Sequence, residues 1–366
     1  MVIVIAAGGT GGHIIPALAL ADNLKTRGDI KVIFLGIGRE LENKLIAGAG
    51  YQLYQISFSP VLGKGMLGLL KMLYLFPLAL LKTLKVYSQE QPDLVIGFGG
   101  YPSFIPIIAS FLSLRPTLLH EQNVKSGLAN RFLSLFCKRI YAVHNAYGFW
   151  SAKLFKNKRP IYIGNPVRKV FYEIPSLKFP LEEQFTILVI GGSQGAIKIN
   201  DAIAANVELL KEKNIKLIHQ TGNSDFERIS ELYNHANYHN VEVFKFIDNP
   251  AYYFSKSHLI VSRAGAMSTA EITAARRPAI FIPLRIASSH QQENIDYLLN
   301  KNAALMLEQN EELASKIGNL FKDLFSNPSR LEQISNALNE ISSIRRIPAA
   351  DILAEDIVSI VRKTRS

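Results

Sequence analysis

The sequence predicts an α/β protein built from two doubly wound parallel-sheet domains. Its 366 residues suffice for two domains with complete cores, at ~150 residues for each. Short β-branched runs alternate with longer stretches of helical periodicity, the pattern of parallel strands joined by helices. The series also restarts, because one glycine-rich turn follows a strand near residue 8 and another follows a strand near residue 191.

Ten short apolar runs are predicted strands. Between them, apolar residues recur at three- and four-residue spacing, for example from Ile14 to Leu24, where Gly28 is the predicted C-cap. The strands fall into two groups of five, Val2–Ala7, Lys31–Leu35, Leu94–Phe98, Thr117–His120 and Ile161–Ile163, and then Thr186–Ile190, Lys216–His219, Val241–Phe246, His258–Val261 and Ala279–Ile282.

The two groups are separated by Gly164-Asn165-Pro166 and a following segment rich in proline and charge. We therefore predict an N-terminal domain over 1–164 and a C-terminal domain over 165–347. A last helix, within 348–366, is expected to pack back on the first domain. Ligands of open α/β sheets bind beyond the carboxyl ends of the strands, so the glycine-rich loops should line a cleft between the domains.

Composition limits the partners and cofactors. The net charge of +11 favours an anionic partner, whether nucleic acid, anionic lipid or a phosphorylated substrate. The single cysteine, Cys137, allows no intramolecular disulfide and favours a reducing compartment. No H-E-x-x-H spacing and no D-x-D pair occurs, so we expect no metal and no cofactor. The chain begins with an apolar strand and no basic leader, so we expect no secretory signal.

One stretch, Met66–Leu84, is apolar enough to suggest contact with a membrane. Lys71, Pro77 and Lys82 interrupt it, whereas a spanning helix needs ~20 mostly apolar residues. We therefore predict a basic, apolar helix that lies in the membrane interface. The alternative is a buried helix of the first domain.

The first glycine-rich loop runs from Gly8 to Gly12 and is followed by His13. Glycines let backbone N–H groups approach a ligand, and a helix N-terminus favours anions. The spacing fits neither a dinucleotide fingerprint nor a P-loop. His13 lies in the first helical turn, whose positive end disfavours imidazolium, so it is a candidate general base. The alternatives are a tight turn and a histidine that only hydrogen-bonds the loop.

Further loops carry candidate ligand-binding side chains. In Gly191–Ala196, Ser193 can donate to a phosphate or serve as an N-cap. Ser268 and Glu271 have the spacing of a capping box, and Glu271 alternatively accepts hydrogen bonds from a ribose. Arg168 suits a pyrophosphate or is a solvated linker side chain. The remaining polar clusters are His120–Asn123, expected to face the cleft, and His290–Asn294, expected to open a helix.

In their order along the chain, these motifs resemble the MurG family of N-acetylglucosaminyltransferases. The resemblance implies a GT-B fold and transfer of N-acetylglucosamine from UDP-N-acetylglucosamine to the muramyl sugar of lipid I, with inversion, to give lipid II for the peptidoglycan. It also implies a peripheral protein on the cytoplasmic face of the bacterial plasma (inner) membrane, with no nucleic-acid partner. The motifs are Gly8–His13, Gly99-Gly100-Tyr101, His120–Asn123, Gly164–Arg168, Gly191–Ala196, Arg263–Ala266 and Gln291-x-x-Asn294.

The resemblance also assigns roles to individual residues. Residues 63–85, with Lys64, Lys71, Lys82 and Lys85, would form the membrane-facing patch. His13 is the candidate base. The donor would contact Thr10, Gly11 and Gly12 in the first loop, Asn123 through the sugar, Arg168 and Ser193 through the pyrophosphate, Ile247 through uracil, Ala266, Met267, Ser268, Thr269, Ala270 and Glu271 through phosphate and ribose, and Gln291 through sugar hydroxyls.

Three other functions remain open at this point. Two keep the fold and change the substrate, namely another UDP-sugar transferase such as a glycolipid synthase, and a sugar-nucleotide 2-epimerase. The third is a basic nucleic-acid-binding protein, which predicts basic and aromatic residues clustered on one surface. The basic residues here are spread along the chain, and no nucleic-acid-binding motif occurs.

Overall fold

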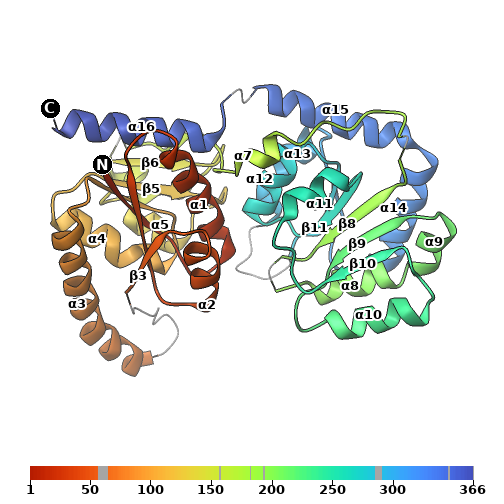
Figure 1. The fold of residues 1–366 in the computed structure, drawn as a ribbon, viewed down its shortest axis with the longest axis horizontal. Helices are drawn as coiled ribbons and strands as arrows, with labels where there is room; N and C mark the ends of the chain where they lie inside the picture. The colour runs from red at the N-terminus through yellow and green to blue at the C-terminus, as the bar shows by residue number, and fades with distance from the viewer. Residues whose placement is uncertain are drawn as a thin grey trace. The chain divides into compact units, whose positions relative to one another are not determined.

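The chain forms two compact units (Figure 1). The computed structural model describes residues 1–56, 65–155, 158–181, 183–192, 194–284, 291–344 and 347–365, without the side chains of 65–73 and 344. Unit 1 comprises Met1–Arg168 and Ile347–Ser366, and unit 2 comprises Lys169–Arg346. Each unit is described by itself.

Unit 1 contains a seven-stranded parallel sheet in the order β3-β2-β1-β4-β5-β6-β7. Buried, parallel strands need helices on both faces. The strands are β1 (Val2–Ala6), β2 (Lys31–Gly36), β3 (Gln52–Gln55), β4 (Leu94–Gly97), β5 (Thr117–Glu121), β6 (Arg139–Ala142) and β7 (Ile161–Tyr162). The helices are α1 (Gly11–Lys25), α2 (Glu40–Glu42), the π-helical turn η1 (Asn43–Ala47), α3 (Gly65–Glu90), the 3₁₀ turn η2 (Tyr101–Ser103), α4 (Phe104–Leu112), α5 (Leu128–Leu133), α6 (Trp150–Leu154) and α16 (Ala349–Arg365).

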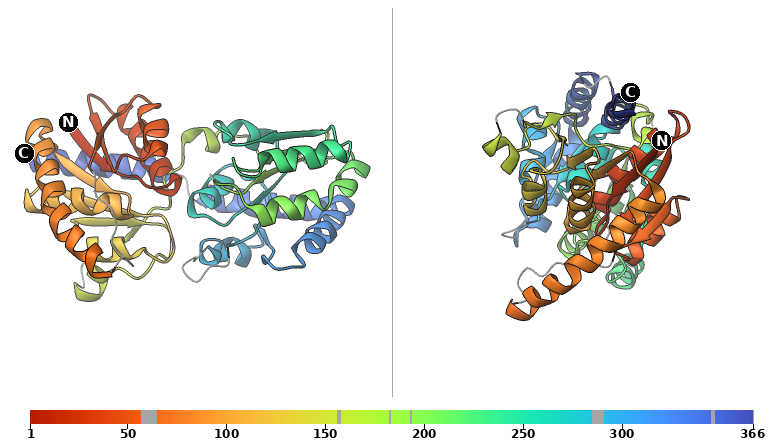
Figure 2. Two further views of the ribbon diagram at one scale, coloured as in Figure 1. Left: turned by 90° about the horizontal axis from the view of Figure 1, so that it is seen from below. Right: turned by 90° about the vertical axis from the view of Figure 1, so that its left-hand side faces the viewer.

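Strand β1 shows how the sheet of unit 1 divides its core. Helices α1 and α16 cover one face of the sheet, and α3 and α4 cover the other (Figure 2). Ile3 and Ile5 point to the first face, whereas Val4 points to the second. The C-terminal helix α16 lies beside α1, and Asp351 accepts hydrogen bonds from Asn23 and Arg27 there. The end of the chain is thereby part of unit 1.

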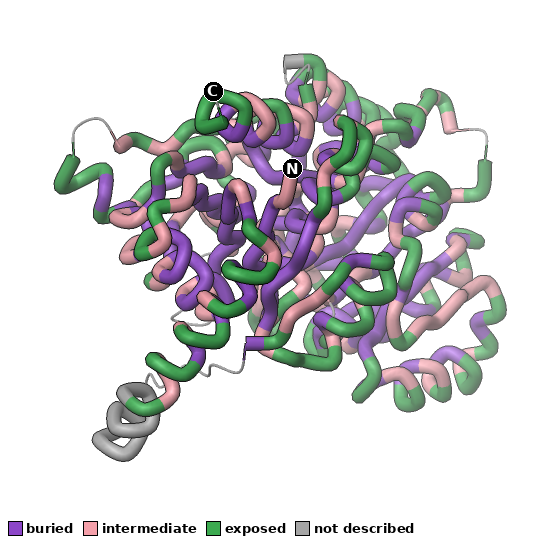
Figure 3. The backbone as a smooth tube through the Cα atoms, turned by 60° about the vertical axis from the view of Figure 1, so that its left-hand side comes forward, coloured by how far each residue is buried: buried purple, intermediate pink, exposed green. Residues whose placement is uncertain are grey.

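Helix α3 has one buried and one exposed face. Ala79, Val86 and Tyr87 are buried against the sheet and α4. The opposite face exposes 69% of Tyr74, 48% of Leu78 and 63% of Leu81, a spacing of four and three residues that aligns them on one side of a helix. Exposed and buried positions accordingly alternate along the described part of α3 (Figure 3). The alternative of a buried helix is therefore wrong for the described part of α3. Gly63 and Lys64 lie outside the described residues, as does the side chain of Lys71.

Unit 2 contains a six-stranded parallel sheet in the order β10-β9-β8-β11-β12-β13. Along β8, Ile187 and Val189 pack on α8 and α14. The strands are β8 (Thr186–Ile190), β9 (Lys216–Gln220), β10 (Val241–Phe244), β11 (Leu259–Ser262), β12 (Ala279–Phe281) and β13 (Leu305–Met306). The helices are α7 (Lys169–Tyr172), α8 (Ile197–Ala204), α9 (Val207–Glu212), α10 (Phe226–His235), α11 (Pro250–Lys256), α12 (Ala266–Ala274), the 3₁₀ turn η3 (Gln292–Asn294), α13 (Asp296–Asn300), α14 (Leu313–Ser326) and α15 (Pro328–Ile344).

The predicted doubly wound fold is confirmed, with local differences. All ten predicted strands form, but β3, β6 and β13 were not predicted. Helix α1 ends at Lys25 with Thr26 at its C-cap, so Gly28 is not the cap but adopts a φ of 120° in the turn that follows.

The strand order reverses between β1 and β4 in unit 1 and between β8 and β11 in unit 2. Loops on the two sides of such a reversal diverge and leave a crevice for ligands. In unit 1 these loops carry Gly8–His13 and Gly99-Gly100. In unit 2 they carry Gly191–Ala196 and Arg263–Gly265. These glycine-containing motifs thus lie at the reversal of strand order in each sheet, where this fold binds ligands.

Candidate active site

His13 is held at the start of α1 by the loop that follows β1. Its Nδ1 lies 3.3 Å from the carbonyl oxygen of Gly8 and 3.3 Å from Oγ1 of Thr10. A carbonyl oxygen can only accept, so Nδ1 of the neutral ring carries the proton and Nε2 keeps its lone pair. A Cβ at Gly100, whose φ is +67°, would lie 3.0 Å from Cε1 of His13. Glycine at this position therefore lets the loop after β4 pack against the imidazole.

The environment of His13 keeps its ring neutral. Burial lowers the pKa of His13 below its ordinary value of 6.5, while the negative charge of Glu121 and the hydrogen bond with Gly8 act in the opposite direction. Burial, rather than the positive end of the helix, is the largest cause. The ring is thus a neutral base at pH 7 that stands in the field of a carboxylate.

A buried carboxylate, Glu42, organises the same loop. Its Oε1 accepts the N–H of Gly9 at 2.8 Å, and its Oε2 accepts the N–H groups of Ile37 at 2.8 Å and Gly38 at 2.9 Å. A Cβ at Gly8 would lie 2.4 Å from Oε1, so a side chain there would displace the Glu42 carboxylate. Glu42 was not among the predicted site residues, because its position in a short acidic helix resembles that of a surface residue. Glu42 thereby holds the backbone of Gly9 against the segment that follows β2.

Glu121 fixes the segment that contains Asn123. Its Oε1 accepts from the backbone N–H of Asn123 at 2.9 Å and from Nδ2 of Asn123 at 3.2 Å. Its Oε2 accepts from the N–H of Gly127 at 2.9 Å and from Nδ2 of Asn130 at 2.8 Å. The same carboxylate acts on the pKa of His13, so the structure brings Asn123 and the first glycine-rich loop into one neighbourhood.

His120 and Gln122 are buried and serve the fold of unit 1, so the expectation that this whole motif faces a cleft is wrong. Nε2 of His120 donates to the carbonyl of Gly164 at 3.0 Å, and its Nδ1 accepts from Nε2 of Gln122 at 3.2 Å. Burial lowers the pKa of His120 to about 4. Asn165 donates to the carbonyl of Gln122 at 3.0 Å. These bonds anchor the segment that ends in the half-buried Arg168.

In unit 2, the loops after β8 and β9 are in direct backbone contact. A Cβ at Gly195 would lie 2.0 Å from the carbonyl oxygen of Thr221, and one at Gly222 would lie 2.4 Å from that of Gln194. Both glycines have positive φ, 76° and 88°. Ser193 lies outside the described residues. The N-cap of α8 is Ala196, so the interpretation of Ser193 as an N-cap is wrong.

Gln220, the last residue of β9, joins the loop after β8 to the segment after β10. Its Nε2 donates to the carbonyl of Gly192 at 2.9 Å, and its Oε1 accepts the N–H of Ile247 at 2.9 Å. The side chain is 3% exposed. Gln220 was not predicted as a site residue, although its place at the carboxyl end of a strand was a usable signal.

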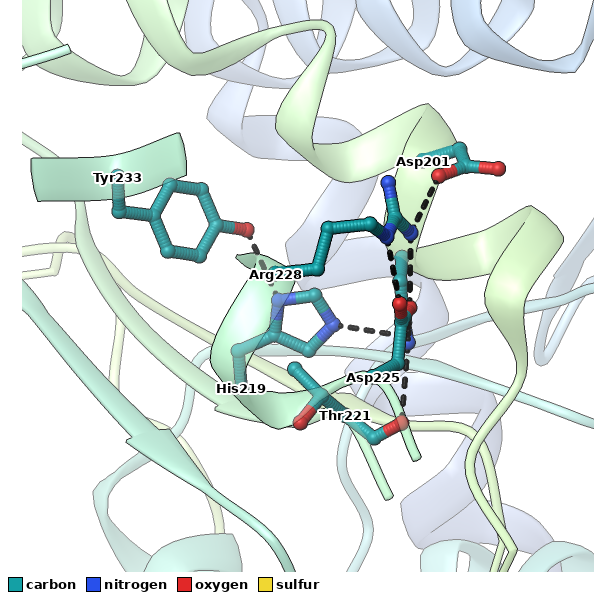
Figure 4. Close-up of polar contacts among 7 residues, drawn as sticks. Asp201, His219, Thr221, Asp225, Arg228 and Tyr233 are labelled. Atoms are coloured by element: carbon teal, nitrogen blue, oxygen red, sulfur yellow. Dashed lines mark hydrogen bonds and ion pairs between the residues drawn. The ribbon is translucent and has the colours of Figure 1, made fainter. Parts of the chain in front are cut away.

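A buried polar network lies behind the loop after β9 (Figure 4). His219 donates from Nε2 to Oδ1 of Asn200 at 3.1 Å and accepts from the hydroxyl of Tyr233 at 2.8 Å. Nδ2 of Asn200 donates to the carbonyl of Thr221 at 3.0 Å and to Oδ2 of Asp225 at 2.7 Å. Burial lowers the pKa of His219 to about 3, against the opposing charge of Asp225.

The network ends in an ion pair. Arg228 donates from Nε to Oδ1 of Asp225 at 2.6 Å and from Nη2 to Oδ1 of Asp201 at 2.7 Å. Burial of Asp225 disfavours its charge, but hydrogen bonds from Arg228 and Asn200 prevail and lower its pKa. The carbonyl of Thr221, and with it the loop that touches Gly195, is thus tied to a charge-compensated cluster.

Helix α12 begins at Ala266, with Gly265 at the N-cap, so Ser268 and Glu271 do not form a capping box. Within this helix Met267, Thr269 and Glu271 are buried, whereas Ala266, Ser268 and Ala270 are partly exposed. The first turn of α12 therefore combines backbone N–H groups with the accessible hydroxyl of Ser268, which suits an anion.

The segment around Gln291 lies beside that first turn. Asn294 donates from Nδ2 to the carbonyl of Ala264 at 3.1 Å, just before the N-cap of α12. Oε1 of Gln291 accepts the N–H of Leu284 at 3.0 Å. Gln291 lies at the start of η3, where a helix start was predicted, and His290 lies outside the described residues.

The described site residues thus divide between the units, with the first loop, Asn123 and Arg168 in unit 1, and Ile247, the start of α12 and Gln291 in unit 2. Two further searches cover the described residues alone. Among the helices described, none is both long enough and apolar enough to cross a membrane. Within the same residues, no three potential metal ligands gather into a cluster.

Comparison with known proteins identifies the family. Residues 3–142 match the glycosyltransferase family 28 N-terminal domain, and residues 186–347 match the glycosyltransferase family 28 C-terminal domain. The UDP-N-acetylglucosamine--N-acetylmuramyl-(pentapeptide) pyrophosphoryl-undecaprenol N-acetylglucosamine transferase of Myxococcus xanthus is 33% identical over 100% of this chain and 94% of its own length.

Solved structures agree with this match. The crystal structure of MurG from Acinetobacter baumannii has 26% identity and a TM-score of 0.74, covering 99% of both chains. The UDP-GlcNAc 2-epimerase of Neisseria meningitidis, at 17% identity and a TM-score of 0.68 over 98% of this chain and all of that one, shares the fold alone.

Two Rossmann-like units, each with a glycine-rich loop at its switch point, and matches to both domains of one family define a GT-B glycosyltransferase. The full-length relative narrows the class further. The chain belongs to the MurG family of N-acetylglucosaminyltransferases.

Proposed function

We propose that this protein transfers N-acetylglucosamine from UDP-N-acetylglucosamine to the 4-hydroxyl of the muramyl sugar of lipid I, forming lipid II in peptidoglycan synthesis. The observation that carries the proposal is the match over the whole chain to a transferase whose name states this donor sugar and this acceptor. A 2-epimerase shares only the fold, so a sugar transfer is preferred over an epimerisation.

The base in this proposal is His13. Inversion in a single displacement requires a group that takes the proton of the attacking hydroxyl. His13 suits this role because its Nδ1–H is engaged with Gly8 and its Nε2 keeps a lone pair. As the proton arrives, the negative charge of Glu121 stabilises the imidazolium.

The donor in this proposal uses both groups of residues. Arg168 and Ser193 hold the pyrophosphate together with the first turn of α12, and Glu271 binds the ribose. Uracil is bound by the backbone of Ile247 through its carbonyl, since the N–H donates to Gln220. Fixed donors of this kind stabilise the charge on departing UDP, and loss of one such donor typically costs ~10²–10³ in rate. The sugar contacts would come from Thr10, Gly11, Gly12, Asn123 and Gln291.

The exposed face of α3 is the proposed membrane contact. Tyr74, Leu78 and Leu81 form an apolar stripe, and Lys82 and Lys85 are exposed at its end. Apolar side chains gain by entering the interface, and each basic residue adds ~1 kcal/mol near an anionic leaflet. The stripe supports a peripheral contact with a membrane surface. We place this contact, and the meeting with the lipid-linked acceptor, at the cytoplasmic face of the plasma (inner) membrane.

The membrane proposal is tested by sedimentation with vesicles of phosphatidylglycerol and phosphatidylcholine. Leu81→Glu places a charge in the apolar stripe and should weaken binding about tenfold, through lost apolar burial and added repulsion. Tyr252→Glu is the matched control, because Tyr252 is 55% exposed on α11 of unit 2. Equal losses in both variants would remove α3 as the contact.

The reaction is tested by transfer of labelled N-acetylglucosamine from its UDP donor to a lipid I analogue, with UDP-glucose and UDP-galactose alongside. Transfer that needs both the N-acetylglucosamine donor and the muramyl lipid supports the proposal. Transfer to a different lipid, or none, contradicts it and leaves the family assignment in place.

A further inference from the structure

We infer that Gln220 is a positioning residue that couples the two halves of the nucleotide site, the loop after β8 and the segment after β10. The inference rests on the proposed function, because these halves are the proposed pyrophosphate and uracil contacts. Gln220 itself need not touch the donor. Its role would be to hold the loop after β8 at a fixed position relative to the segment after β10.

The place of Gln220 in the sheet makes this possible. Strand β9 lies between β8 and β10, and Gln220 is paired in register with Ile190 on one side and Phe244 on the other. These are the last residues of their strands, so both neighbouring loops begin beside Gln220. A side chain at this position reaches both loops.

The chemistry of the side chain matches its two partners. The carbonyl of Gly192 can only accept and the N–H of Ile247 can only donate, which fixes the orientation of the carboxamide. A glutamate would present a second acceptor to the carbonyl of Gly192, and an apolar side chain would satisfy neither group. Because the side chain is 3% exposed, water cannot readily replace it.

Other hydrogen bonds and close contacts already fix the backbone of the loop after β8. The hydrogen bonds of Gln220 therefore set the position of this fixed loop relative to Ile247. The carbonyl of Gly192 also accepts the N–H of Gly195 at 3.0 Å, which closes the loop into a turn. Gly195 in turn packs on Thr221, whose carbonyl is held by Asn200. Within the described residues of these two segments, Gln220 is the side chain that connects the turn to Ile247.

Calorimetric titration of uridine, UDP and UDP-N-acetylglucosamine tests the coupling. In Gln220→Met, which keeps the volume and removes both hydrogen bonds, uridine should bind within about twofold of the unaltered chain while UDP binds about tenfold more weakly. The donor KM should rise about tenfold with little change in the acceptor KM. In Gln220→Glu, which keeps an acceptor for Ile247, uridine binding should be retained and the gain from the diphosphate lost.

The matched control is Asn206→Ala in the same unit. Nδ2 of Asn206 donates to the carbonyls of Ala202 at 2.8 Å and Ala314 at 2.9 Å, away from the strand ends, so this variant should lose stability without a change in UDP affinity. Equal weakening of uridine and UDP in both Gln220 variants, or no weakening, overturns the coupling. If the unaltered chain binds no UDP, the proposed function itself fails. Failure of the coupling alone would instead appear in a chain that still binds UDP.

Discussion

The glycine-rich loops that follow β1 and β8 occupy equivalent positions in the two units, yet different side chains hold them. In unit 1 the buried supports are carboxylates, of which Glu42 holds the loop at Gly9 and Glu121 holds the segment of Asn123. In unit 2 they are the carboxamides of Gln220 and Asn200. The backbone groups to be held are alike, so the choice between a charged and a neutral support needs another reason.

Charge supplies that reason. A carboxylate near His13 favours the protonated ring, which suits a base that must take up a proton during the reaction. The same carboxylate beneath a loop that binds a pyrophosphate would repel the ligand, whereas a carboxamide holds the loop without net charge. Asp225 is the buried acid near the second loop, and Arg228 compensates its charge. We conclude that each unit's supports match the charge of the chemistry proposed for it.

The largest effect expected is on turnover when the base of unit 1 is removed. His13→Ala should lower kcat by about 10²–10⁴ because the acceptor hydroxyl loses its proton acceptor. UDP affinity, for which the proposed contacts are Arg168 and residues of unit 2, should stay within about twofold. Steady-state kinetics and calorimetry measure both, with the exposed His239→Ala as control. Unchanged turnover would end the assignment of His13 as the base. A large loss of UDP affinity would show that His13 also contributes to nucleotide binding.

The next effect is acid destabilisation through one buried, neutral histidine in each unit. His120 and His219 have pKa values of about 4 and about 3, both lowered by burial from an ordinary 6.5. Below pH 6.5 the unfolded chain binds a proton that the folded chain does not. The free energy of unfolding should therefore fall by about 1.4 kcal/mol per pH unit for each histidine down to its folded-state pKa.

Urea unfolding between pH 6.5 and 5 checks this expectation. His120→Gln and His219→Gln should each reduce the slope of the free energy of unfolding against pH by about 1.4 kcal/mol per unit. Trp150, the single tryptophan, lies in unit 1 and reports on that unit, so its fluorescence shows whether the effect of His219→Gln stays in unit 2. Unchanged slopes would show that these histidines are protonated in the folded protein.

The sequence predicted ten strands and missed three, namely the internal and mostly buried strand β6 and the edge strands β3 and β13. Strand β8 has the predicted bounds, because a continuous β-branched run leaves no other interpretation. Strand β3 reads Gln-Leu-Tyr-Gln and lies at a sheet edge, where it pairs with β2 on one side alone. Strand β13 has only two residues. Edge strands form because a neighbouring strand offers hydrogen bonds, which a local pattern does not reveal.

The loops of the candidate site were predicted where a motif lies within one loop, whereas the side chains that support them from elsewhere in the chain were missed. The positions of Gly8–His13 and Gly191–Ala196 followed from local glycine patterns. Glu42 is separated from Gly9 by 33 residues, and nothing in its own neighbourhood indicates burial. Gln220 was within reach of the prediction, since it ends a strand next to Gly222. The order of the strands in the sheet decides which residues distant in sequence meet. The sequence predicted the fold class but not this strand order.

The smallest effect expected, and the most specific to the comparison, is on the pH dependence of turnover. Glu121→Gln removes the negative charge that raises the pKa of His13, so that pKa should fall further. A base works while it is neutral, so the acidic limb of the kcat profile should move to lower pH, with kcat at pH 7 reduced about tenfold by the lost stabilisation of imidazolium. Glu42→Gln is the matched control, since it also loses a buried acceptor of backbone N–H groups in the same unit. It should lower stability without moving the limb. A limb that moves equally in both variants would mean that the two carboxylates act by holding loops alone, and the match between support and chemistry would then fail for unit 1.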